Sequence, residues 1–398
     1  MGLKGFTLPV LAAVAAAGGV IFANQVASVA AATDNKLVDT IPMIDMSAYL
    51  DRENRPEEAA AEIAKVADSL HRFGALVIKD PRVEEQSNTV FIDMLEKYFY
   101  NSDGKRDARP EMHYQVGVTP ENTERPRNHC HRSALLDEKE RPYTGCPPDA
   151  DPKWRFFWRI GSKPKTSKYP QLNADPVIPE EIPEWSDTMD MWGTKMLTAL
   201  HTLAGMAAEG LDLPSNTFQD MMQDAPHLLA PTGSDFNKYG ANGTVLAGYH
   251  YDLNFLTIHG KSRFPGLYVW LRDGRRMPVK VPPGHLIVQA GKQIEYLTGG
   301  YIMCGFHEVV VNEATMAVID KKKAAAAAEG RDTSNLQELW RVSSTLFGHI
   351  ASDQVLKPMG RFATPEALAE FPPVETGQQV QNELNAINLG ADSEKNEL

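Results

Sequence analysis

The stretch VLAGYHYDLNFLTIHG (residues 245–260) belongs to a series of short apolar runs in the second half of the chain. Similar runs follow at close intervals until about residue 350, and glycine, proline, asparagine or aspartate separates them. Short apolar runs bounded by such turn residues are typical of β-strands. Several of them in succession predict a β-sandwich or an open barrel.

The residues before this series combine helical and irregular patterns. Residues 56–72 begin with a proline and two glutamates, and Gly74 follows the last turn, which predicts a helix. Residues 90–99 and 187–211 also carry apolar side chains at helical spacing. Residues 73–80 form an apolar run that predicts a buried strand.

These patterns predict an α+β fold in which helices support a β-core. Along the chain we distinguish a leader (1–32), a helical and irregular region (33–225), the β-core (226–370) and an acidic tail (371–398). The tract KKKAAAAAEG (321–330) strongly favours a helix, so we expect an inserted helix near residues 315–335.

A candidate metal site lies within the opening stretch. His250 and Asp252 are two residues apart, so in a strand their side chains project from the same face. The run GFHEVVVN (305–312) supplies His307 at the start of another strand. Two histidines and one carboxylate that leave coordination positions open are the ligand set of non-haem iron(II) oxygenases.

A candidate anion site follows in LWRVSSTLFGHI (339–350), where Arg341 and Ser343 share one strand face. The guanidinium is a planar, permanently charged fork that pairs with a carboxylate through two hydrogen bonds, and the serine adds a hydroxyl donor. This pair is suited to hold the distal carboxylate of a dicarboxylic co-substrate such as 2-oxoglutarate.

Taken in order, these segments resemble the isopenicillin-N-synthase-like family of 2-oxoglutarate/iron(II)-dependent dioxygenases. The similar segments are HYDL (250–253), FHEVVV (306–311), RVS (341–343) and FNKYG (236–240). The last one is similar to the Asn-x-Tyr element of the family, which implies that Asn237 and Tyr239 approach the co-substrate.

The resemblance also implies a fold and a chemistry. The fold would be a double-stranded β-helix, or jelly roll, with supporting N-terminal helices. The enzyme would bind Fe(II), use 2-oxoglutarate and O₂, and oxidise a C–H bond of a small molecule by hydroxylation, desaturation or oxidative cyclisation. Specialised metabolism is the expected setting, and no catalytic side chain is expected beyond the metal centre.

Two alternatives are consistent with the same residues. In the first, the protein is an Fe(II) oxidase that does not use 2-oxoglutarate, and Arg341 and Ser343 bind the carboxylate of the substrate itself. In the second, the protein is a non-catalytic binding protein on a jelly-roll scaffold. The complete ligand set favours an enzyme over the second alternative.

The charge balance limits the class of partner. The chain has 40 basic and 52 acidic side chains, a formal net charge of −12, which argues against nucleic acid as the main partner. We expect a small-molecule substrate and a monomer. The basic residues Arg125, Arg127, His129 and Arg132 either form a solvated loop or clamp a substrate carboxylate above the iron.

The N-terminus predicts targeting to the secretory pathway or to an organelle lumen. Residues 5–32 contain no charge, follow Lys4 and end in small residues, which is typical of a signal peptide or of an uncleaved membrane anchor. The last four residues, KNEL, differ at one position from an address for retention in the endoplasmic reticulum.

Three cysteines and one sequon relate to that compartment. The cysteines show no CxxC spacing, so they are either buried thiols or, in an oxidising compartment, include a Cys130–Cys146 bridge. Asn242-Gly243-Thr244 matches the sequence for N-glycosylation, which requires that its loop be exposed.

Overall fold

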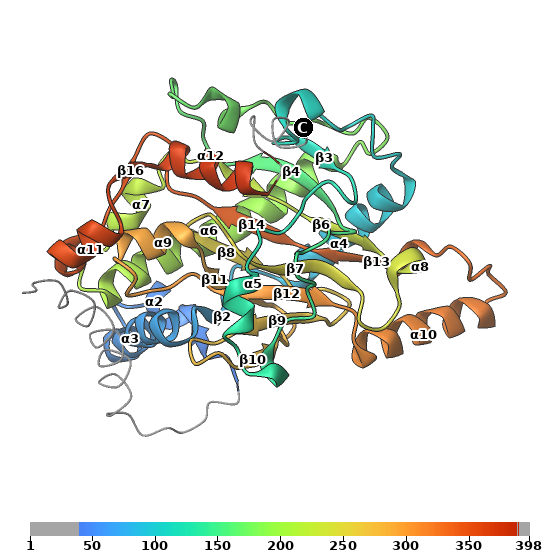
Figure 1. Cartoon of the computed structure of the whole chain (residues 1–398), viewed down its shortest axis with the longest axis horizontal. Helices are drawn as coiled ribbons and strands as arrows, with labels where there is room; N and C mark the ends of the chain where they lie inside the picture. The colour runs from blue at the N-terminus through green and yellow to red at the C-terminus, as the bar shows by residue number, and fades with distance from the viewer. Residues whose placement is uncertain (1–39, 388, 390–398) are drawn as a thin grey trace, which may run out of the picture. The chain divides into compact units, whose positions relative to one another are not determined.

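The β-core consists of two sheets (Figure 1). Residues of both sheets line one cavity. The computed structural model describes residues 40–387 and 389. The larger sheet has the strand order β1 (Met43–Asp45), β2 (Ala75–Lys79), β11 (His285–Ala290), β8 (Leu256–His259), β14 (Thr345–Gly348), β5 (His227–Leu229), β4 (Trp154–Ile160), β6 (Thr232–Asp235) and β13 (Trp340–Ser343), with β3 (Gly117–Thr119) paired to β4. The smaller sheet has the order β10 (Arg276–Pro278), β9 (Leu267–Trp270), β12 (Phe306–Val310) and β7 (Val245–Tyr251). This arrangement agrees with the predicted jelly roll.

The remaining elements surround these two sheets. Two short strands, β15 (Val355–Leu356) and β16 (Val374–Glu375), pair with each other. The helices are α2 (Met46–Leu50), α3 (Pro56–Phe73), α4 (Glu85–Asn101), α5 (Cys130–Ala134), α6 (Trp185–Gly210), α7 (Thr217–Met221), α8 (Phe236–Tyr239), α9 (Lys292–Leu297), α10 (Glu313–Ala328), α11 (Pro365–Glu370) and α12 (Thr376–Ala386).

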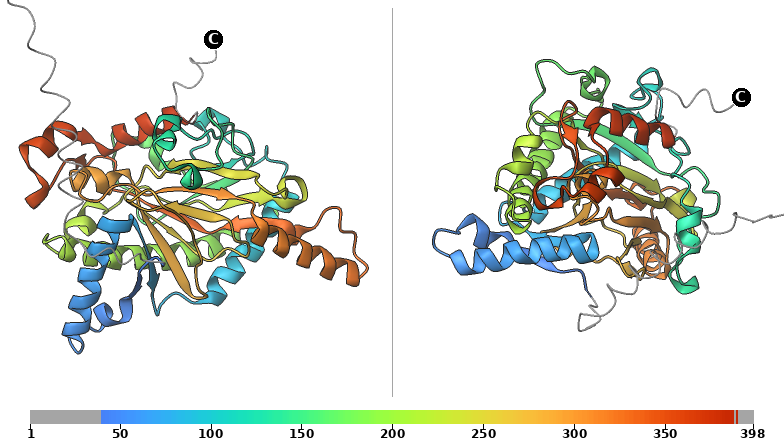
Figure 2. Two further views of the ribbon diagram at one scale, coloured as in Figure 1. Left: turned by 60° about the horizontal axis from the view of Figure 1, so that its bottom comes forward. Right: turned by 60° about the vertical axis from the view of Figure 1, so that its left-hand side comes forward.

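Three long helices, α3, α4 and α6, support the larger sheet (Figure 2). The central one, α6, contacts the other two helices and lies against β4, β8 and β14. It buries the side chains of Trp185, Trp192, Leu200 and Leu203, and each such burial stabilises the fold by roughly 1.5–3 kcal/mol. Since the sheet is thereby covered on its outer face, its inner face is left to line the cavity.

The ends of α3 follow the sequence prediction. Pro56 occupies the first turn, where its missing N–H removes no helical hydrogen bond. Gly74 ends the helix with a positive φ of 65°, and its N–H donates to the Leu70 carbonyl. The chain then turns directly into β2, so α3 is fixed against the edge of the sheet.

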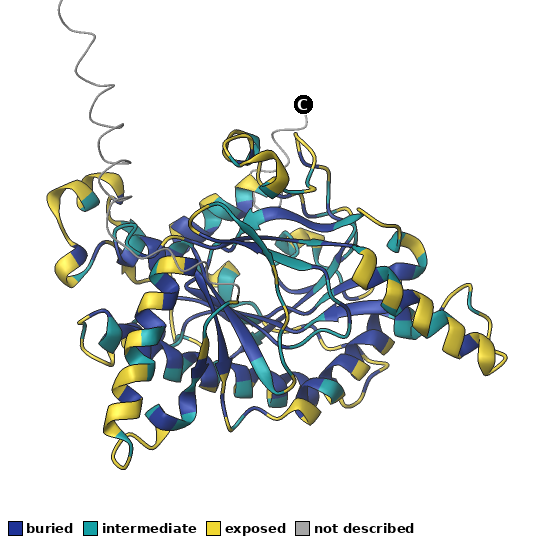
Figure 3. Cartoon of the chain, turned by 90° about the horizontal axis from the view of Figure 1, so that it is seen from below, coloured by how far each residue is buried: buried dark blue, intermediate teal, exposed yellow. Residues whose placement is uncertain are grey.

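The predicted inserted helix is present as α10. Asn312 and Thr315 form a capping box at its start. Most of its residues are exposed, as Figure 3 shows, and only Thr315, Ile319 and Ala326 are buried. The intrinsic helix preference of alanine therefore accounts for this segment better than packing does.

The segment predicted as an acidic tail contains a packed helix. Val380 and Leu384 of α12 are buried, together with Leu389. The spacing of Val380 and Leu384 places them on one helical face. Because glutamines and asparagines surround them, the composition of the segment did not predict a packed helix. The leader and the KNEL sequence lie outside the described residues. Within the described part of the chain, none of the helices has the length and apolar character needed to span a bilayer.

Candidate metal centre

Two neighbouring strands of the smaller sheet bring the three predicted ligands together. The antiparallel pairing of β12 with β7 places His307 directly opposite His250, and Asp252 follows at the end of β7. Asp252 Oδ1 lies 3.8 Å from His250 Nε2, and its Oδ2 lies 3.9 Å from His307 Nε2. The three potential ligand atoms lie within 4.8 Å of one another, so one ion can contact all three.

The backbone of β7 fixes the orientation of His250. The Nδ1 of His250 lies 2.5 Å from the Gly248 carbonyl and donates to it, which leaves the Nε2 lone pair free for a metal. The Gly248 N–H donates to Asp151 Oδ1 at 2.9 Å. A buried carboxylate thus anchors the strand two residues before the first ligand.

The electrostatics of the site favour the forms that bind a cation. Burial lowers the pKa of His250 to about 3, and the neighbouring His307 adds to this effect. Burial alone would raise the pKa of Asp252, but the attraction of His307 and His250 outweighs it, so this pKa lies below its usual value. At neutral pH the imidazoles are therefore uncharged and the carboxylate is ionised, as metal binding requires.

The donor set fits iron(II). Asp252 is 7% exposed, and its Oδ2 is buried without a hydrogen-bond partner among the described residues. A buried carboxylate oxygen without a partner is costly, and a cation bound between the three side chains would remove that cost. Within the described residues, this is the one group of His, Cys, Asp or Glu side chains whose ligand atoms converge in this way.

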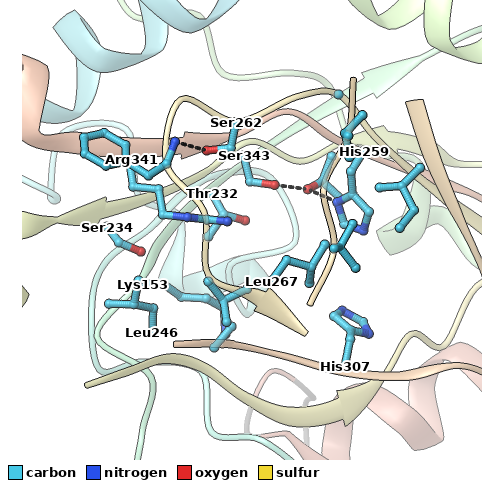
Figure 4. Close-up of a pocket in the computed structure, with 18 of the residues that line it drawn as sticks. Lys153, Thr232, Ser234, Leu246, His259, Ser262, Leu267, His307, Arg341 and Ser343 are labelled. Atoms are coloured by element: carbon cyan, nitrogen blue, oxygen red, sulfur yellow. Dashed lines mark hydrogen bonds between the residues drawn. The ribbon is translucent and has the colours of Figure 1, made fainter. Parts of the chain in front are cut away.

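A cavity of about 260 Å³ extends from the ligands between the two sheets (Figure 4). The pairing of β13 with β6 places Arg341 beside Ser234 and Ser343 beside Thr232, and all four residues line the cavity. Arg341 and Ser343, which the sequence predicted to share a face, therefore meet two further hydroxyls. Thr232 and Ser234 were not predicted as site residues, although their spacing of two in the run TGSD predicts a common strand face.

Arg341 is a buried cation without an anionic partner. Arg341 is 5% exposed, and its Nε has no hydrogen-bond partner. No carboxylate of the described residues lies within ion-pair distance of its guanidinium. Burial lowers the pKa of this guanidinium to about 10, so it stays charged at neutral pH. This part of the cavity can therefore receive a carboxylate.

A chain of hydrogen bonds continues from Ser343 across the cavity wall. The Ser343 and Thr345 hydroxyls lie 3.0 Å apart, and Thr345 Oγ1 lies 2.9 Å from His259 Nδ1. Gln289 Nε2 donates to His259 Nε2 at 3.0 Å, so Nδ1 carries the proton and donates to Thr345. The Ser343 hydroxyl is thus held in place by neighbours that the sequence analysis did not single out.

The structure does not bring Asn237 and Tyr239 to this cavity, because neither residue lines it. The Asn237 amide instead donates to Asp235 Oδ1 and to the Leu336 carbonyl, and it accepts from the Leu336 N–H at 2.9 Å. These contacts fasten α8 to the segment before β13. A direct role for the two residues at the co-substrate stays a prediction that the geometry does not support.

A second cavity, of about 120 Å³, adjoins the first. His250, Asp252, Lys153, Arg155 and Phe347 line both cavities, whereas His307 lines only the first. Two of the three ligands therefore stand where the two cavities meet.

The predicted basic loop lies at the second cavity. Arg125, Arg127 and His129 are among its lining residues, whereas Arg132 stacks on the Phe306 ring at 4.2 Å. Cys130 forms a disulfide with Cys146, which closes the loop after these residues.

Comparisons with known proteins agree with this geometry. A family model described as the 2OG-Fe(II) oxygenase superfamily matches residues 229–347, a range that contains His250, Asp252, His307 and Arg341. A relative from Gibberella zeae named 2-oxoglutarate-dependent dioxygenase is 22% identical over 283 residues, which cover 68% of each chain.

Two solved structures share the fold. The full-length Neurospora crassa T7H in complex with alpha-KG has a TM-score of 0.67 at 16% identity, covering 89% of this chain and 98% of that one. A 2OG-Fe(II) oxygenase family protein from Caulobacter crescentus has a TM-score of 0.61 at 20% identity, covering 87% of this chain and 99% of that one.

Proposed function

Because this chain belongs to the 2OG-Fe(II) oxygenase superfamily, we propose that it oxidises a C–H bond of a small molecule at iron held by His250, Asp252 and His307. When bound, Fe(II) supplies the chemistry that couples the conversion of 2-oxoglutarate and O₂ to succinate and CO₂ with oxidation of the substrate. Hydroxylation, desaturation and oxidative cyclisation are all compatible outcomes.

One observation carries the proposal: the buried, unpaired cation of Arg341 and the three metal ligands line a single cavity. Arg341 would bind the distal carboxylate of 2-oxoglutarate, and the Ser343 hydroxyl would add a hydrogen bond. The contact with Thr345 limits rotation of that hydroxyl, so it is oriented before the co-substrate arrives. No side chain needs to act as a general base.

The bound molecules and names of structural relatives support a small-molecule substrate. The Neurospora T7H has also been crystallised with thymine and with 5-formyluracil, and a rice relative is named as a dioxygenase for auxin oxidation. We infer that the second cavity holds the substrate, because His250 and Asp252 line it and Arg341 does not.

Stoichiometry tests the proposal. Purified protein reconstituted with Fe(II) should form succinate only when 2-oxoglutarate and O₂ are both present, and formation should accelerate with substrate. If substrate is consumed without succinate, 2-oxoglutarate is not used, and Arg341 and Ser343 bind the substrate carboxylate instead.

We also infer that the chain matures in an oxidising compartment of the secretory pathway or of an organelle. The disulfide between Cys130 and Cys146 supports this, since such bonds persist mainly outside the cytosol. The uncharged stretch 5–32 is consistent with delivery there. Mass analysis of the native protein without reduction should find these two thiols oxidised; free thiols in a cytosolic fraction would contradict the assignment.

A further inference from the structure

The second cavity has one wall made by the C-terminal helix. Val380, Glu383 and Leu384 of α12 line it, and Ile387 and Leu389 extend the same wall. Phe157 and Phe347 lie among the residues opposite, from β4 and β14. Most of this surface is apolar, so it favours a compact hydrocarbon or aromatic body over a sugar or a nucleotide.

The imidazole of His349, which lines this cavity, has a nitrogen without a hydrogen-bond partner. His349 is 4% exposed, and its Nδ1 is buried without a hydrogen-bond partner. Burial lowers the pKa of this imidazole to about 4, so the ring is neutral at physiological pH. A buried imidazole nitrogen without a hydrogen bond costs about 1–3 kcal/mol, which a ligand can recover by pairing with Nδ1.

All but one of the arginine and lysine side chains that line the cavity pair with a carboxylate. Arg127 donates to Glu383 Oε2 at 3.1 Å, and Arg155 lies 3.1 Å from Glu124 Oε2. Lys153 is paired with Asp151 and with Glu124.

The guanidinium of Arg125, by contrast, donates to the Pro148 carbonyl at 3.2 Å. Among the described arginine and lysine side chains of this cavity, it is the one without a carboxylate partner. The residue is exposed, so it stands where the cavity meets solvent. A cation in this position attracts an anion and orients it toward the interior.

We propose that this cavity selects a compact, largely apolar carboxylic acid, with Arg125 pairing with its carboxylate and His349 donating or accepting a hydrogen bond at its buried end. This inference rests on the proposed function, because it places the substrate in the cavity that Arg341 does not line. It goes further by naming the substrate class and two specificity-determining residues.

Paired probes test the charge preference. Protein loaded with Fe(II) and 2-oxoglutarate is titrated without O₂ by calorimetry, using 3-phenylpropionate and its neutral isostere 3-phenylpropionamide. The carboxylate should bind at least about tenfold more tightly, and Arg125→Gln should abolish that difference, whereas Arg125→Lys should retain part of it. The matched control Arg72→Gln removes an exposed arginine on α3 and should change neither affinity.

The hydrogen bond is tested with 4-hydroxyphenylpropionate, which adds a hydroxyl to the end of the ring. His349→Leu should reduce its affinity about tenfold, and His349→Asn, which keeps a polar atom near the position of Nδ1, should restore most of it. A role of His349 in packing alone would give equal losses for both variants and would overturn this assignment.

Failure of the carboxylic-acid inference can be distinguished from failure of the proposed oxygenase function. If the amide binds as tightly as the carboxylate, or if neither binds, the carboxylic-acid inference is wrong. Succinate formation without substrate, measured on the same protein preparations after O₂ is admitted, reports on the proposed function independently. If it is absent from the wild-type protein, the proposed function fails; if it is present without a carboxylate preference, only this inference fails.

Discussion

Replacing Arg341 with methionine should separate co-substrate binding from folding. The change removes the guanidinium and keeps most of the side-chain length, so the cavity wall is largely preserved. Arg341 is 5% exposed and has no carboxylate partner among the described residues, so the protein alone does not compensate its charge. The free variant should therefore unfold at the same temperature as the wild type or slightly higher.

The magnitude follows from the loss of one buried charge pair. Removing one member of such a pair costs about 2–5 kcal/mol, and a central value of about 3 kcal/mol corresponds to roughly 150-fold weaker binding. We expect the KM for 2-oxoglutarate to rise by about this factor, while the affinity for Fe(II) changes little. Initial rates of succinate formation against 2-oxoglutarate concentration measure the first quantity, and anaerobic titration measures the second.

The exposed residue Arg72 gives the control, because Arg72→Met removes the same charge far from the cavity. If the KM for 2-oxoglutarate is unchanged in Arg341→Met, Arg341 does not bind the co-substrate. Lys153 or Arg155, which line the same cavity, would then be the co-substrate anchor.

Three further outcomes are expected. Gly233→Ala should destabilise the fold by about 1–3 kcal/mol in chemical denaturation, because its Cβ would lie 2.6 Å from the Phe99 ring; unaltered stability would mean that α4 moves away freely. Burial raises the pKa of Glu96 to about 7 from 4.5, so the wild type should lose stability as pH rises between these values. The Glu96→Gln variant should not show this loss of stability, which is worth up to about 3 kcal/mol. If the stabilities of wild type and variant change in parallel from pH 4 to 8, Glu96 is not the group responsible. Asn242 lies in an exposed turn, so protein from a eukaryotic secretory host should lose mass on N-glycosidase treatment. The Asn242→Gln variant from the same host should not lose mass. An unmodified Asn242 in that material would count against the proposed compartment.

Local patterns made the metal ligands predictable from sequence. His250 and Asp252 lie in one strand, where alternation alone places both side chains on one face. The same alternation identified Arg341 and Ser343, and it continues through Thr345, Phe347 and His349, each of which lines at least one of the two cavities. The signal for His349 was therefore present, although the chain crosses from β13 to β14 before reaching it.

Other parts of the site depend on contacts between distant segments. Lys153 and Arg155 line the same cavities as His250 and Asp252 because β4 pairs with β5 and β6, which no local pattern indicates. The helix α12 was hidden by its polar composition, although it forms a wall of the second cavity. Asn237 was assigned from resemblance, and its amide is used to hold the backbone at Leu336 instead.

Titration of iron-free protein with Fe(II) in the absence of O₂ shows whether His250, Asp252 and His307 hold the iron. The wild-type chain should bind one iron, and 2-oxoglutarate should bind tightly only after the metal. His307→Ala and Asp252→Ala should each lose the iron while unfolding cooperatively like the wild type. If either variant binds one iron as tightly as the wild type does, these three side chains are not the metal centre.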